Sequence, residues 1–224
     1  MTDATEADGS PSGDLNVQHC VTTAPATLPV LDEAGRSALF TEARTANTFS
    51  SEPVSDETLR AVWELARWPP TAANTQPLRV AFVRTDEGRN RLVPLLAEGN
   101  RAKAEAAPVV AIFAADVDFH EFVPRTFPAR AEMKEGLEAS GREGRVPMAR
   151  FNSTLQIGYF LLAARAHGLA TGPMAGFDHD AVSAEFFPGG REQALLVVNL
   201  GHPGENAWFP RLPRLDEEDV VRWA

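Results

Sequence analysis

The chain has one cysteine, Cys20, among its 224 residues, so no internal disulfide can form and nothing indicates an oxidising compartment. It also has no apolar run near the roughly 20 residues that span a bilayer. Basic residues are few: 21 against 31 acidic residues give a net charge of -10, which repels nucleic acid and anionic membranes. Neither nucleic acid nor a membrane is therefore expected as a partner.

The motifs of several common enzyme classes are also missing from the sequence. There is no GxGxxG after a predicted strand, no GxxxxGK followed by Ser or Thr, and no Gly-x-Ser-x-Gly elbow, which argues against a Rossmann site, a P-loop and a serine hydrolase. The five histidines show no metal-ligand spacing. Asp116, Asp118, His120 and Glu121 lie close together, and they are interpreted as a solvated acidic loop after a strand.

Residues 1–30 differ in composition from the rest of the chain. They are rich in Ser, Thr, Asp, Gly and Pro, and they lack both the basic start and the apolar centre of a signal peptide. Such a segment buries too little apolar surface to order itself, so it is predicted to be a flexible N-terminal extension. Residues 31–224 are predicted to form one domain, and the cytoplasm is the expected location.

Apolar spacing and capping residues predict the first helices. One runs from about Asp32 to Arg44, with Phe40 among its inward positions. The next has Ser55 as a favourable N-cap and ends at Pro69, because proline disfavours a helical conformation in the residue before it. Two shorter helical segments are predicted after the first strand, the second of them near residues 101–106.

A long helix is predicted near the middle of the chain. Apolar residues lie almost all round the segment from about Met148 to His167, and Gly168 stands where a C-cap glycine belongs. This segment is predicted to be a central buried helix. The preceding segment, from Asp118 to about Pro147, is predicted to be an irregular, mobile excursion that covers a site.

Three apolar runs are predicted as strands: Arg79–Arg84, Pro108–Asp116 and Ala194–Gly201. A short helix should close the chain at DEEDVVRW. Helices and strands alternate without strict βαβ repetition, which favours either an α/β or an α+β fold, with a central mixed sheet flanked by helices.

Three stretches carry groups that suit a ligand. ARTANTF, residues 43–49, offers the donors of Arg44, Thr45 and Asn47 to a phosphate, although an arginine at a helix end can also serve the helix dipole. PPTAANTQP, residues 69–77, has small residues that let a flat ligand approach and amides that suit a heterocycle edge, although it also fits a plain structural turn. In TGPMAGFD, residues 171–178, glycines flank backbone N–H groups that could face an electron-rich ring.

In this order, the three stretches resemble the motifs of the FMN-dependent nitroreductase superfamily. PPTAANTQP and PMAGFD match the family's second and third motifs well, whereas Ala43 and Asn47 stand where arginines are common in the first. Phosphate binding would therefore rely more on Arg44 and Thr45. The stretches ARTANTF, PVSDETLR, TGPMAGFD and RLPRL resemble the branch that contains malonic semialdehyde reductase of pyrimidine utilisation. The resemblance covers about Leu31 to Trp223.

This resemblance implies a nitroreductase-like α+β fold, with residues 31–224 as the FMN-binding domain and two chains in an intertwined homodimer. FMN would lie at the subunit interface. The implied contacts with the phosphate and ribityl chain are Arg44, Thr45 and Asn47, with Arg211 or Arg214. From the partner subunit, flavin would be contacted by Pro70, Thr71, Ala72 and Asn74, with Gln76 nearby. The implied contacts along the ring edge are Pro173, Met174, Ala175 and Gly176.

The implied activity is a ping-pong reduction. NADH or NADPH would give a hydride to flavin N5, which would pass it to a small carbonyl compound such as malonic semialdehyde, giving 3-hydroxypropionate, or to a nitro or quinone compound. No catalytic side chain is assigned, because the flavin carries the hydride. Arg125 or Arg130 would bind a substrate carboxylate, unless both are ordinary surface arginines.

Two other functions fit the same residues. The flavin could work in the opposite direction, in an oxidase or dehydrogenase that tailors a biosynthetic intermediate. The chain could also be a flavin-binding protein without turnover. Oxygen consumption without added NAD(P)H would favour the former, and a flavin that NADH and NADPH fail to bleach would favour the latter.

Overall fold

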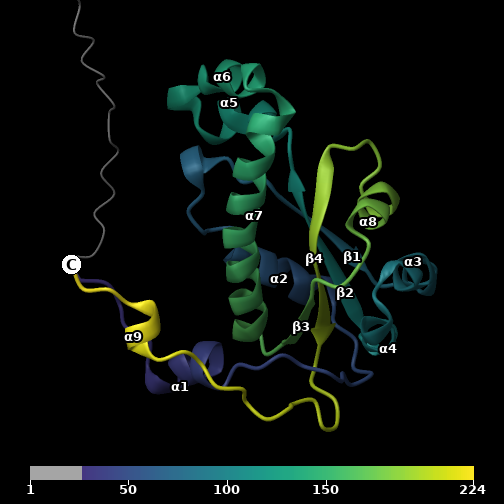
Figure 1. Cartoon of the computed structure of the whole chain (residues 1–224). Helices are drawn as coiled ribbons and strands as arrows, with labels where there is room; N and C mark the ends of the chain where they lie inside the picture. Colours follow the sequence, from purple (N-terminus) through teal and green to yellow (C-terminus); the bar gives the residue numbers. More distant parts are fainter. Residues whose placement is uncertain (1–26) are drawn as a thin grey trace, which may run out of the picture. The chain divides into compact units, whose positions relative to one another are not determined.

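An antiparallel sheet of four strands lies at the centre of the fold in this computed structural model (Figure 1). The strands are β1 (Leu78–Val83), β2 (Val109–Asp116), β3 (Ala170–Met174) and β4 (Glu192–Gly201), in the order β1-β2-β4-β3. The α+β class is confirmed, but the prediction of a mixed sheet is wrong for these strands, since all their pairings are antiparallel. The helices after β1 return the chain to the end of the sheet where β1 stops, so β2 runs back along it.

The structure describes residues 27–224. Residues 1–26, which include Cys20 and most of the predicted flexible extension, lie outside the described part. Leu31–Ala224 form one compact unit. Within residues 27–224, no helix has the length and apolar character needed to cross a membrane.

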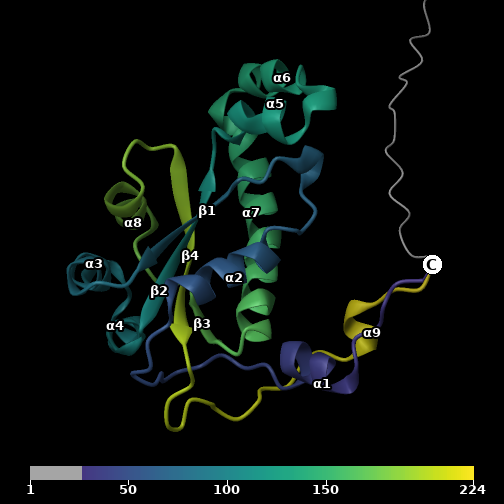
Figure 2. The ribbon, with the colours of Figure 1, turned by 180° about the vertical axis from the view of Figure 1, so that it is seen from behind.

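Helices α2 (Asp56–Ala66) and α7 (Gly141–Ala166) cover one face of the sheet (Figures 1 and 2). Ser55 caps α2 as predicted, because its hydroxyl accepts the N–H of Thr58 at 3.0 Å. The core on this face includes Leu59, Val62, Phe113, Phe160 and Val198. Burial of these side chains fixes both helices against the sheet.

The other face of the sheet is covered by α3 (Asp86–Leu92), α4 (Glu98–Ala106) and α8 (His179–Phe186), with a 3-10 turn at Val93–Leu95 between α3 and α4. The core on this face includes Leu92, Leu96, Ile112, Val182 and Val197. Because helices cover both faces, every residue of β2 is buried, as its continuous apolar run predicted.

The first predicted helix is mostly wrong. A four-residue α1 (Glu33–Arg36) continues into a π-helical turn (Ser37–Thr41), and the chain is then extended. Phe40, predicted to point inward, is 55% exposed. The predicted short helix at the C-terminal end is confirmed as α9 (Glu217–Val220).

The segment predicted as an irregular excursion is helical. It contains a 3-10 turn (Phe119–Phe122), α5 (Val123–Thr126), a second 3-10 turn (Pro128–Arg130) and α6 (Met133–Ala139). Phe119 and Val123 are fully buried. These buried side chains hold a series of short helices. The helices were not predicted, because the prolines and scattered charges of the segment indicated irregular structure.

Helix α7 is longer and less buried than predicted. It begins at Gly141, and one face carries exposed apolar side chains: Phe151, Leu155 and Tyr159. The prediction of burial all round is therefore wrong within a single chain. The predicted glycine stop is confirmed, because Gly168 follows the helix with a φ of 74°.

Asp116, at the end of β2, is the centre of a buried ion-pair network and not part of a solvated loop as predicted. Its side chain is fully buried and accepts two hydrogen bonds from Arg191, at 2.8 and 2.9 Å, and one from Arg79. Arg191 also donates to Glu121, which lowers the pKa of that carboxyl. Burial lowers the pKa of His120, and repulsion by Arg145 adds to the effect. No metal-binding cluster of His, Cys, Asp or Glu occurs in residues 27–224.

We expect Asp116→Asn to lower the free energy of unfolding by about 2–4 kcal/mol, because two arginines would lose their shared charged partner. The matched control is Glu132→Gln, which breaks the exposed pair with Arg130 and should cost less than about 1 kcal/mol. Urea denaturation at fixed protein concentration measures both. Equal midpoints for the two variants would contradict the structural role of Asp116.

Candidate functional site

The Arg44–Asn47 segment is extended and lies beside the edge strand β3. The Ala46 N–H donates to Thr171 O at 2.9 Å, and the Asn47 N–H donates to Ala207 O at 2.9 Å. Thr45 and Thr171 form an isolated parallel bridge. A Cβ at Gly172 would lie only 2.9 Å from Ala46 O, so glycine is needed where the two backbones approach.

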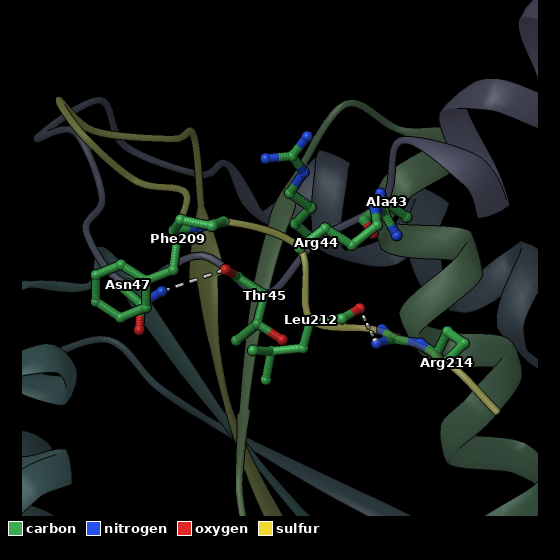
Figure 3. A pocket seen from close by; sticks show the side chains of 9 residues that line it. Ala43, Arg44, Thr45, Asn47, Phe209, Leu212 and Arg214 are labelled. Carbon is green, nitrogen blue, oxygen red and sulfur yellow. Dashed lines mark hydrogen bonds between the residues drawn. The ribbon is translucent and has the colours of Figure 1, made fainter.

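A pocket of about 490 Å³ opens between this segment and the C-terminal segment, residues 209–224 (Figure 3). Its polar lining comprises Arg44, Thr45, Asn47, Arg211 and Arg214. The structure therefore brings the three residues expected at the phosphate and ribityl chain together with both of the arginines that were given as alternatives. Arg211 donates to the carbonyls of Thr41 and Ala43, which ties the C-terminal segment to the end of the π-helical turn.

The pocket is strongly cationic. Within the described part of the chain, the carboxylate paired with these arginines is Glu42, whose Oε2 lies 3.8 Å from Arg44 Nη2. Arg214 donates to the backbone carbonyls of Leu212 and Pro213 at 2.9 and 3.2 Å, and these bonds leave its charge uncompensated. Of the three arginines that line the pocket, Arg44 has this weak acidic partner, and Arg211 and Arg214 donate to backbone carbonyls, so the lining suits a bound dianion.

A second pocket, of about 260 Å³, adjoins the first because Thr45 and Asn47 line both. Its other walls include the predicted ring-edge residues: Pro173, Met174, Ala175 and Gly176. The segment was predicted as a glycine-rich loop, but its first part is strand β3, and only the turn after Met174 is irregular.

The turn after β3 is fixed by hydrogen bonds to the carbonyl of Gly176, and the N–H groups of Ala175 and Gly176 are left available to a ligand. Gly176 O accepts from Ala97 N and from Asn100 Nδ2, both at 2.9 Å. A Cβ on Gly176 would lie 3.0 Å from that amide nitrogen, so a larger residue would push Asn100 away. The N–H groups of Ala175 and Gly176 have no acceptor among residues 27–224, and both residues are exposed.

The second pocket also contains residues that were not predicted from the sequence, among them Asn100 and Lys103. Both lie on α4, three positions apart, so they share a face of the helix. Lys103 Nζ donates to Asn47 Oδ1 at 3.0 Å. The spacing was visible in the sequence, but nothing in the sequence placed α4 beside residues 44–47.

The Pro70–Gln76 loop has an unusual backbone. Ala73, Asn74 and Gln76 have positive φ values of 51°, 52° and 45°, a conformation that non-glycine residues seldom adopt. Asn152 of α7 accepts the Ala72 N–H at 2.7 Å and supports the loop. Strain of this kind is typical of loops whose shape serves a function.

The amides of this loop are occupied within the chain. Asn74 Nδ2 donates to Thr126 O at 2.7 Å, and Gln76 Nε2 donates to Asn74 Oδ1 at 2.9 Å. These two bonds use one donor and one acceptor site of the exposed Asn74 amide, and the expected contact of this amide with a heterocycle stays a prediction. The loop's exposed residues next to these amides are Pro70 and Ala72.

The loop does not join the other candidate residues within one chain. It precedes β1, whereas the ring-edge turn follows β3, and these are the two edge strands of the sheet. Three strand spacings separate the edges, or about 14 Å. In Figures 1 and 2 the loop between α2 and β1 lies beside α7, and residues 44–47 lie near the opposite end of that helix.

The sequence profile of the nitroreductase family matches residues 41–202. A Streptomyces coelicolor protein with the provisional name NADH dehydrogenase/NAD(P)H nitroreductase is 53% identical over 197 residues, which cover 88% of this chain and 97% of that protein. A Leptothrix cholodnii protein with the same provisional name is 50% identical over 186 residues, covering 83% of this chain and 94% of its own length.

Solved structures show the same fold. A provisionally named nitroreductase from Exiguobacterium sibiricum, in complex with FMN, superimposes with a TM-score of 0.77 at 20% identity, covering 88% of this chain and all of that one. An NAD(P)H:FMN oxidoreductase, also provisionally named, from Staphylococcus epidermidis gives a TM-score of 0.75 at 19% identity, covering 88% of this chain and 98% of the other. With most of its length matched by the profile and by close relatives, the chain belongs to the nitroreductase family.

Proposed function

We propose that this protein is an FMN-dependent oxidoreductase that uses NADH or NADPH to reduce a small carbonyl compound, with nitro and quinone compounds as further acceptors. The observation that carries the proposal is the pair of adjoining pockets that share Thr45 and Asn47. One pocket is cationic and the other offers backbone N–H groups. FMN has the matching chemistry, a phosphate at one end and a ring with acceptor atoms at the other.

The first pocket fits the phosphate of FMN. Arg44, Arg211 and Arg214 carry three positive charges, and Thr45 adds a hydroxyl donor. The chain as a whole has a net charge of -10, so this local concentration of cations runs against the overall charge. A bound dianion would relieve the repulsion between the arginines.

The second pocket fits an edge of the flavin ring. The N–H groups of Ala175 and Gly176 would donate to ring acceptors, and Gly176 lets the ring approach because it has no side chain. FMN, when bound, supplies the means to accept a hydride and to pass it on. The chain's own contribution is to bind the phosphate, orient the ring and leave one side of it open to nicotinamide and substrate.

A second copy of the chain would complete the site. The Pro70–Gln76 loop lies at the opposite edge of the sheet from the two pockets, so it would reach FMN only from a partner chain. Exposed apolar side chains on α7 and in the C-terminal segment support a homodimer: Phe151, Leu155, Tyr159, Leu212, Leu215 and Trp223. Such a dimer would hold two equivalent sites.

The stretches ARTANTF, PVSDETLR, TGPMAGFD and RLPRL resemble the branch that contains malonic semialdehyde reductase, so malonic semialdehyde is the favoured substrate. Its carboxylate needs a cation. Arg125 fits this role better than Arg130, because Arg130 already donates to Glu132 at 2.8 Å. Arg125 lies over the Phe122 ring at 5.3 Å and precedes Thr126, the residue that anchors Asn74. It is therefore next to the loop that would meet the partner's FMN.

Arg44→Ala should weaken FMN binding by about 10- to 100-fold, because a charge-assisted contact with the phosphate would be lost. Fluorescence titration of flavin-free protein with FMN measures the dissociation constant. Arg60→Ala, which removes an exposed arginine of α2 paired with Asp56, is the control and should bind FMN normally. Full FMN affinity in the Arg44 variant would show that the phosphate lies elsewhere.

Arg125→Ala should raise the Michaelis constant for malonic semialdehyde by about tenfold and leave that for an uncharged aldehyde unchanged. Arg130→Ala serves as its matched control and should change neither constant. Steady-state oxidation of NADH or NADPH, followed by absorbance, gives both values. If the Arg125 variant keeps its Michaelis constant for the carboxylate substrate, another group binds the carboxylate.

A further inference from the structure

Three arginines lie against the ring of Phe122, which is half-buried at the end of a 3-10 turn. The Cζ atoms of Arg79, Arg191 and Arg125 lie 5.0, 5.2 and 5.3 Å from the ring centroid. At such distances a guanidinium group is attracted to the electron-rich face of an aromatic ring. Phe122 is therefore a shared neighbour of residues from β1, from the chain just before β4 and from α5.

Within the described part of the chain, Arg125 is the member of this group that has no acidic partner. Arg79 and Arg191 both donate to the buried carboxylate of Asp116. Arg191 also pairs with Glu121. The exposed charge of Arg125 therefore stays uncompensated beside two other guanidinium groups, and this arrangement favours an anion at Arg125.

The chain on either side of Phe122 fixes its ring in place, because Phe119 and Val123 are fully buried. Phe122 and Arg125 are three residues apart in a helical stretch, so their side chains are neighbours on one face. A long exposed arginine loses rotamer freedom when it binds a ligand, and this loss weakens binding. A fixed ring beside the guanidinium restricts it beforehand and so reduces the loss on binding.

The same group of side chains is attached to the Pro70–Gln76 loop. Arg79 donates to the last carbonyl of the loop at 3.1 Å. Asn74 of the loop donates to Thr126 O at 2.7 Å, and Thr126 directly follows Arg125. The ring and the arginines around it therefore keep a fixed relation to the loop that would meet the partner's FMN.

We propose that Phe122 is a positioning residue, which holds the guanidinium of Arg125 where it binds the carboxylate of the substrate. The inference rests on the proposed function, because that function assigns the carboxylate to Arg125. The ring acts through Arg125 and takes no part in hydride transfer. It thereby sets the preference of the enzyme for aldehydes that carry a carboxylate over uncharged ones.

The test is a double-mutant cycle of Phe122→Leu with Arg125→Ala, followed by steady-state oxidation of NADH or NADPH with malonic semialdehyde or propanal, which is uncharged. We expect Phe122→Leu to raise the Michaelis constant for malonic semialdehyde about two- to fivefold, the size of one exposed cation–π contact, and to leave that for propanal unchanged. Phe122→Tyr keeps the ring and should keep the wild-type constants. In the Arg125→Ala background, Phe122→Leu should have no further effect.

Phe186→Leu is the matched control, because Arg91 lies over the Phe186 ring at 5.2 Å on α8, outside this group. It should change neither Michaelis constant. The inference is overturned if Arg125→Ala raises the constant for malonic semialdehyde and Phe122→Leu does not. It is also overturned if Phe122→Leu raises the constants for both aldehydes alike, or acts equally in both backgrounds, since its role would then be structural.

Failure of the proposed function gives a different result. If Arg125→Ala leaves the constant for malonic semialdehyde unchanged, the proposed carboxylate contact fails and this inference fails with it. A wild-type protein that reduces neither aldehyde overturns the proposed function as well. Both results are distinct from a failure confined to the Phe122 variants.

Discussion

The candidate site depends on one backbone contact, between the Arg44–Asn47 segment and strand β3. Ala46 donates to Thr171 O at 2.9 Å, and Gly172 provides the space for the approach. This contact sets the cationic segment directly beside the turn that follows Met174. Asn100 and Lys103 of α4 then join the two, because one bonds Gly176 and the other bonds Asn47. Without the contact, the arginines and the ring-edge turn would be separate surface features.

The same architecture separates the Pro70–Gln76 loop from the two pockets within one chain. Sheet order places β1 and β3 at opposite edges, so the loop before β1 cannot meet the turn after β3. The conformation of this loop nevertheless costs free energy, because three non-glycine residues have positive φ. Asn152 of α7 supports the loop by accepting the Ala72 N–H. Strain in a loop that lines neither pocket of its own chain is consistent with a role across an interface. The exposed apolar face of α7 points to the same conclusion, since Phe151 is 66% exposed.

Local sequence signals predicted the elements that depend on local physics. The cap at Ser55, the buried strand β2 and the glycine after α7 followed from residue type and spacing. The prediction of an irregular excursion after Asp118 was wrong. The short helices of this segment are held by the burial of Phe119 and Val123 against distant parts of the chain, which periodicity does not reveal. Asp116 was misread as solvated because its partner Arg191 is distant in sequence. Lys103 was missed for the same reason: its significance lies in a contact with a segment far from it along the chain.

The visible absorption spectrum of the freshly purified protein tests the central claim most directly, recorded without oxygen before and after NADH or NADPH is added. The account predicts the bands of oxidised flavin at about one FMN per chain, as two equivalent sites in a dimer require, and loss of those bands on addition of the nicotinamide. A colourless protein that also fails to take up added FMN would contradict the assignment of the two pockets. Bound flavin that neither NADH nor NADPH bleaches would contradict the proposed activity.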